Sequence, residues 1–201
     1  MKERLDILLV KSGFFESKEK AQRAIMAGLV IVNDKRIDKS GTFIKLDKDP
    51  VIRIKGEVSK YVSRGGLKLE KALQVFGMKL TEKTILDVGA STGGFTDCLL
   101  QNGAGFVYAM DVGTNQLDWK LRNDDRVKSI ENTHIKDLTE NDLDNKKMDY
   151  IVMDVSFISI TKVLEYLVKF CQPETKLMAL IKPQFETDRE YIEKGGIVKD
   201  T

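Results

Sequence analysis

Cysteine, histidine, proline and tryptophan are all scarce in this chain of 201 residues. It holds two cysteines, one histidine, three prolines and one tryptophan. Cys98 and Cys171 are too few and too far apart for a disulfide-rich scaffold, and the single histidine leaves no Cys and His cluster for a zinc site. We therefore expect no bound metal and a reducing environment.

Long hydrophobic runs are also missing. The longest uncharged stretch, residues 98–110, falls well short of the roughly 20 apolar residues that a membrane-spanning helix needs. The first six residues carry charges of both signs, unlike a secretory signal peptide. We therefore expect a cytoplasmic protein that does not enter a membrane.

What is present is an ordinary globular composition with an uneven distribution of charge. Hydrophobic residues make up 42% of the chain, and its length allows two modest domains or one large one. Residues 1–60 hold 14 Lys and Arg against 9 Asp and Glu, a net charge of +5, whereas residues 61–201 hold 19 against 22, a net charge of −3. The basic segment suggests a polyanionic partner such as nucleic acid, although a solvated basic surface explains the charge equally well.

The first part of the chain has the pattern of a small α+β module. Apolar residues at helical spacing predict a helix from Leu5 to Gly13, and Ser17 is a typical N-cap for a second helix that ends at Gly28. Strands are predicted at residues 29–32 and 51–54, the first followed by a turn at residues 33–34. Basic side chains of this module would attract phosphates without reading base sequence, and the candidates are Arg4, Lys11, Lys18, Lys20, Arg23 and Lys35.

This module resembles the S-four RNA-binding domain. The resemblance lies in the spacing of Arg4-Leu5-Asp6, Leu9-Val10, Gly13, Ser17-Lys18, Ala21, Ile25, Gly28, Val30 and Val32-Asn33. It implies that residues 1–60 bind structured RNA. The strand pattern stops near residue 57, so we place a linker at residues 59–66, which adds Arg64 as an RNA-binding candidate, and a second domain at residues 67–201.

The second domain alternates apolar strands with helical stretches. A helix with apolar positions Leu69, Leu73 and Phe76 comes first and ends at Gly77. Strands are predicted at residues 84–88, 106–110, 127–130, 150–153 and 177–181, with helices near residues 93–103, 114–122 and 160–171. This alternation is typical of a mainly parallel, Rossmann-like α/β sheet, in which ligands bind at the carboxyl ends of the strands.

A glycine-rich loop at residues 87–96 follows the first of these strands. Its glycines let a ligand approach the backbone, and the next helix begins with free N–H groups. Gly89, Gly93 and Gly94 lack the dinucleotide spacing Gly-x-Gly-x-x-Gly, and the preceding Asp87 disfavours a pyrophosphate. An acidic loop suits S-adenosylmethionine, whose amino-acid end carries an ammonium and a sulfonium group.

A second acidic residue, Asp111, ends the next strand, one βαβ crossover after Asp87. Its carboxylate can accept hydrogen bonds from both hydroxyls of a ribose, and a helix-capping role is compatible with that. The loop and the acid together predict an S-adenosylmethionine site formed by Asp87, Gly89, Ala90, Ser91, Thr92, Gly93, Gly94, Asp111 and Val112. Residues 131–134 follow the third strand and could border the adenine, whereas His134 is interpreted as an ordinary surface histidine.

Asp154 and Lys182 follow the last two predicted strands and should face the same cleft. Asp154 lacks the Asp-Pro-Pro-aromatic context of amino-methylating enzymes, and no Pro-Cys pair follows it, which leaves oxygen as the methyl acceptor. A hydroxyl must lose its proton during methylation, and a lysine whose pKa is lowered from about 10.4 by a nearby cation can orient or deprotonate it. We predict Lys182 in this role, with Lys68 as the nearby cation and Asp154 holding both.

All of these motifs together resemble the haemolysin-A-like family of ribosomal RNA 2′-O-ribose methyltransferases, which is related to FtsJ. The shared pieces are the N-terminal module, Ser63-Arg64-Gly65-Gly66-Leu67-Lys68-Leu69, residues 87–96, Asp111-Val112-Gly113, Asp154-Val155-Ser156-Phe157 and Lys182-Pro183-Gln184-Phe185. The resemblance implies a Rossmann-like S-adenosylmethionine-dependent methyltransferase fold, with ribosomal RNA or ribosomal subunits as partners. It also implies that Lys68, Asp154 and Lys182 match three members of a Lys-Asp-Lys-Glu catalytic tetrad.

Two departures from the family pattern bear on function. Residues 131–134 read Glu-Asn-Thr-His in place of the usual Glu-Arg-Thr-Asn, and the chain stops at Thr201, before the family's last strands and the tetrad glutamate. We therefore expect a shortened sheet in which the strand at residues 177–181 is an exposed edge. Two alternatives stay open: a non-catalytic protein that binds RNA and cofactor, and a membrane-active haemolysin. Trp119, Cys98 and Met110 are interpreted as core residues.

Overall fold

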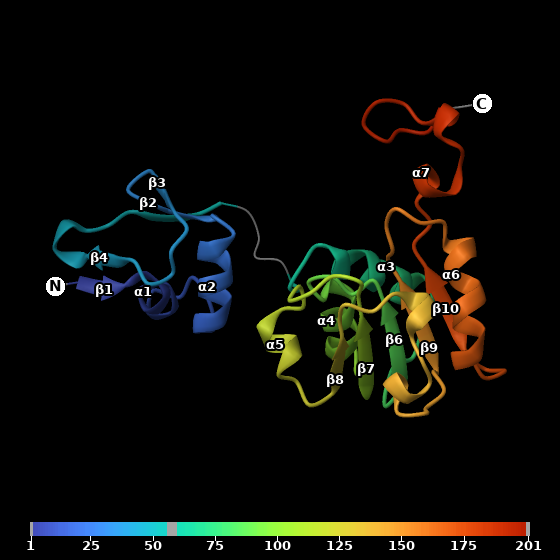
Figure 1. The fold of residues 1–201 in the computed structure, drawn as a ribbon. Coiled ribbons are helices and arrows are strands. Elements are labelled where there is room, and N and C mark those ends of the chain that lie inside the picture. The colour runs from blue at the N-terminus through green and yellow to red at the C-terminus, as the bar shows by residue number, and fades with distance from the viewer. Residues whose placement is uncertain (1, 56–59, 200–201) are drawn as a thin grey trace. The chain divides into compact units, whose positions relative to one another are not determined.

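The protein divides into two compact units in a computed structural model (Figure 1). The structure describes residues 2–55 and 60–199. The N-terminal unit is Met1–Ser59 and the C-terminal unit is Lys60–Thr201. Within the described ranges, none of the helices has the length and apolar character needed to cross a membrane.

The N-terminal unit consists of two helices and short antiparallel strands. Its elements are β1 (Lys2–Arg4), α1 (Leu5–Lys11), α2 (Lys18–Met26), β2 (Val30–Val32), β3 (Lys35–Ile37), β4 (Phe43–Lys45), a 3₁₀ turn (Leu46–Lys48) and β5 (Ile52–Ile54). β1 pairs with β4, and β2 lies between β3 and β5. Leu5, Leu9, Ile25 and Val30 are fully buried and form the core of this unit.

Local signals in the sequence explain both helices and one turn of this unit. Ser17 caps α2, because its Oγ accepts a hydrogen bond from the Lys20 N–H at 3.3 Å. Asn33 (φ 49°) and Asp34 (φ 61°) both have the left-handed conformation of a type I′ turn, which joins β2 to β3. The sequence analysis missed β1, β3 and β4, because none of them has the repeated β-branched apolar residues that predicted strands at residues 29–32 and 51–54.

The C-terminal unit is a parallel five-stranded sheet with helices on both faces (Figure 1). Its elements are α3 (Gly65–Phe76), β6 (Thr84–Val88), α4 (Gly94–Gln101), β7 (Phe106–Met110), α5 (Trp119–Arg122), β8 (Val127–Ile130), β9 (Tyr150–Met153), α6 (Ile160–Leu167), β10 (Lys176–Ala179) and α7 (Pro183–Glu186), with 3₁₀ turns at Ile135–Asp137, Asn141–Leu143, Val168–Phe170 and Arg189–Tyr191. The strand order is β10-β9-β6-β7-β8, and every neighbouring pair is parallel. The predicted α/β class with a parallel sheet is confirmed.

Alternate residues of the strands pack on opposite faces of this sheet. Ile85 and Val152 belong to a core cluster with side chains of α3, α4 and α5, whereas Leu86 and Ile151 belong to a second cluster with side chains of α6 and residues 135–143. Burial on both faces explains why these strands are continuous apolar runs in the sequence. Because the strands are parallel, the loops after β6, β7, β9 and β10 meet at one end of the sheet.

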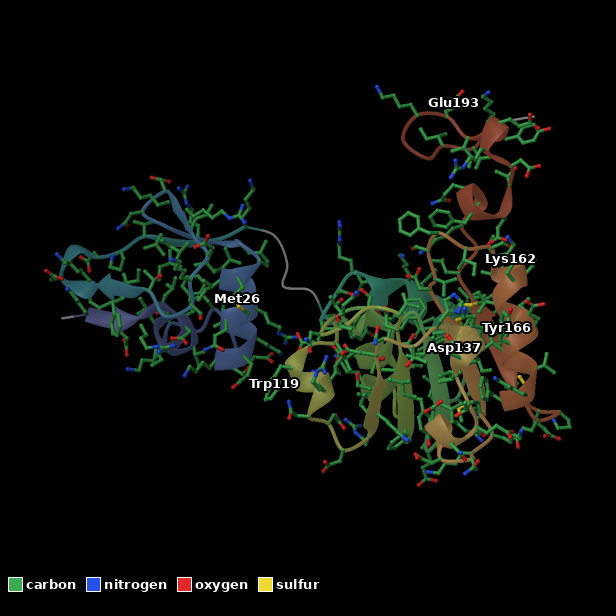
Figure 2. The ribbon with its side chains drawn as sticks, in the orientation of Figure 1. Met26, Trp119, Asp137, Lys162, Tyr166 and Glu193 are labelled. Atoms are coloured by element: carbon green, nitrogen blue, oxygen red, sulfur yellow. The ribbon has the colours of Figure 1, made fainter. Side chains whose placement is uncertain are left out.

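The predicted bounds hold for four of these strands, and three other expectations need correction. β10 begins at Lys176 and ends at Ala179, although the Leu180 N–H still donates to the Met153 carbonyl oxygen of β9 at 2.9 Å. α5 is a single turn and does not span residues 114–122. Trp119 is 76% exposed on α5 (Figure 2), so its assignment to the core was wrong. Cys98 and Met110, in contrast, are buried as predicted.

Candidate functional site

A cleft lies at the carboxyl ends of the strands, in two adjoining cavities of about 280 and 860 Å³. Both cavities are bordered by Gly89, Ser91, Asp154 and Ser156. The smaller one is also lined by Ser63, Gly65, Lys68, Ala90, Thr92, Gly94, Phe95 and Lys182, and the larger one by Val88, Met110, Asp111, Val112, Gln116, His134, Ile135, Val155, Phe157, Ile158, Ser159, Lys162, Val163 and Phe185. The predicted cofactor and catalytic residues therefore lie together, except that Asp87 and Gly93 line neither cavity.

The glycine-rich loop between β6 and α4 turns with several left-handed residues. Gly89 (φ 82°) and Gly93 (φ 92°) adopt this conformation, and so does Ser91 (φ 50°) in spite of its side chain. A Cβ atom at Gly93 would lie 2.2 Å from the Leu121 side chain, so only glycine allows α5 to pack this closely. Gly93 therefore packs against α5 on the side of the loop away from the cleft, while residues 89–92 border the cleft.

Asp111, at the end of β7, is fixed by two backbone hydrogen bonds. Its Oδ2 accepts from the Ser91 N–H at 2.7 Å, and its Oδ1 accepts from the Gly113 N–H at 2.7 Å. Asp111 borders the larger cavity, and each carboxylate oxygen keeps capacity for a second donor. This arrangement fits the vicinal hydroxyls of a ribose, and the cavity is large enough for a nucleoside.

Asp87 lies beneath the loop and is completely buried. Its Oδ2 accepts a hydrogen bond from Thr96 Oγ1 at 2.6 Å, and its Oδ1 has no hydrogen-bond partner among the described residues. Burial raises the pKa of Asp87 to about 7, against the opposing effect of the Thr96 hydrogen bonds. Asp87 thus contacts the beginning of α4 beneath the loop, and its side chain does not line the cleft.

Lys68, Asp154 and Lys182 form a compact charged group next to this loop. Lys68 Nζ donates a hydrogen bond to Asp154 Oδ2 at 3.0 Å, and Lys182 Nζ lies 2.6 Å from Asp154 Oδ1. Lys182 Nζ also donates to Ser156 Oγ at 2.7 Å. The Lys182 side chain is only 18% exposed, whereas that of Lys68 is 50% exposed. The structure therefore brings together three residues that come from α3 and from the loops after β9 and β10.

Opposing effects act on the charge of Asp154. Burial raises its pKa, but the contacts with Lys182 and Lys68 outweigh burial and hold the pKa below its ordinary value. Asp154 is therefore a carboxylate at neutral pH. Such a group keeps two ammonium groups close together at the border of both cavities, which is suited to orienting an acceptor hydroxyl and handling its proton.

Aromatic side chains occupy the rim of the larger cavity. Phe157 is 91% exposed and has a left-handed backbone, with φ 65°. Its ring centroid lies 5.3 Å from that of Phe185, in a tilted arrangement. An exposed phenylalanine in a strained conformation is uncommon, and such strain often marks a functional site. The sequence analysis placed both residues near the cleft but assigned neither a role, because backbone conformation leaves no local signal at a phenylalanine.

The predicted RNA-binding residues of the N-terminal unit differ in their availability. Arg4 is held by Asp6 through two hydrogen bonds of 3.1 and 2.8 Å, and Lys11 and Lys20 form ion pairs with glutamates. Arg23 has Nε and Nη1 buried without a hydrogen-bond partner in the described part of the chain. Lys18 and Lys35, like Arg64 in the C-terminal unit, are exposed. The exposed cations are the better candidates for phosphate contacts.

Of residues 131–134, which were expected near the adenine, one lines the cleft. His134 lines the larger cavity, and its Nδ1 accepts a hydrogen bond from the Lys136 N–H at 3.2 Å. Glu131 lines neither cavity. In residues 2–55 and 60–199, no group of three or more His, Cys, Asp and Glu side chains is placed to hold a metal ion.

Known proteins are similar to this chain over most of its length. Residues 61–201 match the FtsJ-like methyltransferase family, and residues 3–49 match the S4 domain. A Bacillus subtilis protein assigned as an rRNA methyltransferase, YqxC, is 52% identical over 199 residues, which cover 99% of this chain and 70% of that protein. The 16S/23S rRNA (cytidine-2′-O)-methyltransferase TlyA of Mycobacterium tuberculosis is 39% identical over 197 residues, covering 98% of this chain and 73% of the relative.

Solved structures agree with these matches. A Streptococcus thermophilus protein assigned as a hemolysin has a TM-score of 0.70 and 50% sequence identity. That similarity covers 99% of this chain and 72% of the solved chain. Both units of this chain therefore fall within a similarity to a protein of known structure.

Proposed function

Because this chain belongs to the TlyA, or haemolysin-A-like, family of rRNA methyltransferases, we propose that it methylates a ribose 2′-hydroxyl of ribosomal RNA with S-adenosylmethionine. The observation that carries this proposal is the Lys68–Asp154–Lys182 group at the border of the two cavities. Two ammonium groups around one carboxylate suit an oxygen acceptor, since its proton must be handled as the methyl group arrives.

The residues around the cleft fit S-adenosylmethionine. The larger cavity combines a fixed carboxylate, Asp111, with the apolar side chains of Met110, Ile135 and Val163. Asp111 would hold the ribose hydroxyls, the apolar side chains would contact the adenine, and the backbone of residues 89–91 would border the amino-acid end. When bound, the cofactor supplies an electrophilic methyl group.

The acceptor ribose is proposed to enter beside Lys182. In this proposal Lys182 first releases a proton to solvent, and its neutral Nζ then accepts a hydrogen bond from the 2′-hydroxyl and takes up the hydroxyl proton as the methyl group arrives. Asp154 keeps Lys182 and Lys68 in place. Lys68 stabilises the charge on Asp154 and contributes a second cation near the reacting oxygen. Alignment of the two reactants by these contacts supplies much of the rate.

The acceptor base is proposed to stack on Phe157 at the rim of the larger cavity. An exposed aromatic ring can hold an unstacked base, which is how many proteins recognise single-stranded RNA. Phe185 supports the Phe157 ring from one side. Phe157, whose backbone is in the left-handed conformation, would thus hold the base next to the reacting ribose.

The N-terminal part is proposed to dock the RNA. We assign residues 1–60 to an S4-type RNA-binding domain and residues 67–201 to the methyltransferase domain, joined through residues 59–66. Residues 56–59 lie outside the described residues. The exposed Lys18, Lys35 and Arg64 would contact phosphates, so their replacement should weaken binding of all RNA sequences alike and reduce its salt dependence.

Calorimetry and a methyl-transfer assay test this function. We expect S-adenosylmethionine to bind the chain, Asp111→Ala to abolish binding, and Asp125→Ala, which removes an exposed carboxylate, to leave it unchanged. The methylated position in ribosomal RNA is then mapped at nucleotide resolution. Binding without any methylated 2′-hydroxyl would favour a non-catalytic protein that binds RNA and cofactor, and a folded chain that does not bind the cofactor would refute the proposal.

A further inference from the structure

The Glu131 carboxylate acts as a clamp on the loop between β7 and α5. Glu131, directly after β8, accepts hydrogen bonds from three consecutive backbone N–H groups: Asn115 at 2.9 Å, Gln116 at 3.0 Å and Leu117 at 3.1 Å. Arg122 Nη2 donates to the same carboxylate at 2.7 Å. Residues 115–117 precede α5, so their N–H groups have no acceptors within a helix. The Glu131 side chain accepts all three hydrogen bonds instead.

The Glu131 carboxylate stays charged under all ordinary conditions. Its side chain is 14% exposed, and that of Arg122 is 30% exposed. Burial raises its pKa, but the hydrogen bonds from Arg122 and from the three N–H groups outweigh burial and lower it to about 2. Hydrogen bonds to a charged acceptor are stronger than those between neutral groups, so the clamp is a strong constraint on the loop.

The clamped loop forms one side of the cleft. The Asp118 N–H donates to the Thr92 carbonyl oxygen at 3.2 Å, which joins the loop to the glycine-rich segment. The Asn132 N–H donates to the Gly113 carbonyl oxygen at 2.9 Å, and Gly113 in turn holds Asp111. Gln116, in the middle of the clamped segment, lines the larger cavity.

The loop also has an uncommon backbone conformation. Asn115 has φ 52°, a left-handed conformation that asparagine adopts more readily than most residues with a side chain. A Cβ atom at Gly113 would lie 1.8 Å from Gln116 Nε2, so the Gln116 side chain lies against the Gly113 backbone. If Glu131 did not accept the N–H groups of residues 115–117, we expect the Asn115 backbone and the Gln116 side chain to lose these positions.

We propose that Glu131 is a positioning residue that sets affinity for the nucleoside end of the cofactor by fixing residues 113–118 beside Asp111. The proposal rests on the use of S-adenosylmethionine proposed above. Glu131 acts without touching the cofactor, because it lines neither cavity. This role differs from the direct adenine contact expected for residues 131–134 from the sequence.

Glu131→Gln tests the proposal in the full chain, with the matched control Glu140→Gln. Both changes remove one charge from an ion-paired glutamate, but Glu140 pairs with Lys147 away from the cleft. We expect calorimetric affinities for S-adenosylmethionine and for adenosine to fall by about the same factor, roughly tenfold or more, in Glu131→Gln only. Glu131→Asp, which keeps the charge, should recover part of the loss.

Hydrogen exchange gives a readout that does not depend on any ligand. The amides of residues 115–117 should exchange faster in Glu131→Gln than in the wild-type chain, and those of β6 and β9 should not change. Methyl-transfer kinetics should show a raised KM for the cofactor with unchanged kcat and KM for RNA. The proposal is overturned if Glu131→Gln folds and binds both ligands as the wild-type chain does.

The outcomes separate this inference from the proposed function. A wild-type chain that binds neither ligand refutes the cofactor assignment and, with it, the role of Glu131. Tight wild-type binding that Glu131→Gln leaves unaltered overturns the inference alone. If Glu131→Gln does not fold, the same affinities and exchange rates measured on Glu131→Asp decide, since unchanged values there would also overturn it.

Discussion

Asp154 and Lys182 form an ion pair of 2.6 Å at the ends of two neighbouring parallel strands, β9 and β10. The same lysine donates to Ser156 Oγ, so two groups fix its Nζ. The position of this ammonium is therefore determined by the loops of two strands.

Lys182→Met should abolish methyl transfer while preserving the fold. Loss of a group that handles the acceptor proton typically lowers the rate by about 10²–10⁴-fold. Cofactor affinity should stay within a factor of about two, because Asp111 and the glycine-rich loop are untouched. Single-turnover transfer to ribosomal RNA and calorimetry measure the two quantities. Lys194→Met, at an exposed lysine, is the control, and a Lys182→Met enzyme with wild-type rate would contradict the assignment.

Phe157→Gly should make the protein more stable and less active. Glycine relieves the left-handed strain at φ 65°, which is worth about 1 kcal/mol, and little packing is lost because the ring is 91% exposed. Removal of the proposed stacking surface should raise the KM for RNA. Urea unfolding and steady-state kinetics measure the two effects. Phe157→Tyr should retain activity, and a Phe157→Gly variant with unchanged KM would remove the stacking role.

Glu186→Ala should loosen the segment that carries Lys182. Glu186 Oε2 accepts from Ser159 Oγ at 2.6 Å, and its Oε1 accepts from the Ile160 N–H at 3.0 Å, so it caps α6 and joins the loops after β9 and β10. Loss of such a cap costs about 1 kcal/mol of unfolding free energy. We also expect a lower kcat with unchanged cofactor affinity. Glu190→Ala, at a nearby exposed position, should change neither quantity, and equal effects of both substitutions would contradict a specific role.

Asp87→Asn should remove a pH-dependent loss of stability. The folded pKa of Asp87 is raised to about 7, so the folded state retains the proton better than the unfolded state. The contribution of Asp87 to stability is thus fullest below its unfolded pKa near 3.9 and declines as pH rises toward 7. Asparagine mimics the protonated form and avoids this decline.

Urea unfolding from pH 4 to pH 8.5 tests that pH dependence. The stability of Asp87→Asn relative to the wild-type chain should increase with pH and level off above 7, reaching about 2–4 kcal/mol. Asp125→Asn, at an exposed carboxylate, should show no such trend. A constant difference between Asp87→Asn and wild type at every pH would mean that Asp87 is not protonated in the folded state.

Much of the fold could be predicted because its signals are local. The strands β6, β7 and β9 have the predicted bounds, since strands buried on both faces need a largely apolar sequence. The edge strand β8 also has the predicted bounds, although its residues are only partly buried. Ser17 caps α2 as predicted, because capping involves residues only three positions apart. The proximity of Asp154 and Lys182 was also predicted, because parallel strands carry their carboxyl ends to one edge. Lys68 lies on α3 and was included as a nearby cation that the family resemblance supports.

Other features depend on contacts between distant segments, which no local pattern records. The burial of Asp87 under Thr96, the exposure of Trp119 and the left-handed conformation of Phe157 follow from packing around them. The clamp by Glu131 joins residues on either side of α5 through backbone N–H groups that every sequence carries.

The sequence by itself determined the α/β class, the family and the positions of the reactive side chains, because periodicity and motif spacing are properties of the chain alone. Only the tertiary structure decided which of those side chains face the cleft and which support it from behind. Asp111 and Lys182 border the cavities, whereas Asp87 and Glu131 do not. The physical reason is that exposure, hydrogen bonding and pKa are set by neighbours in space, and the sheet brings those neighbours from separate loops.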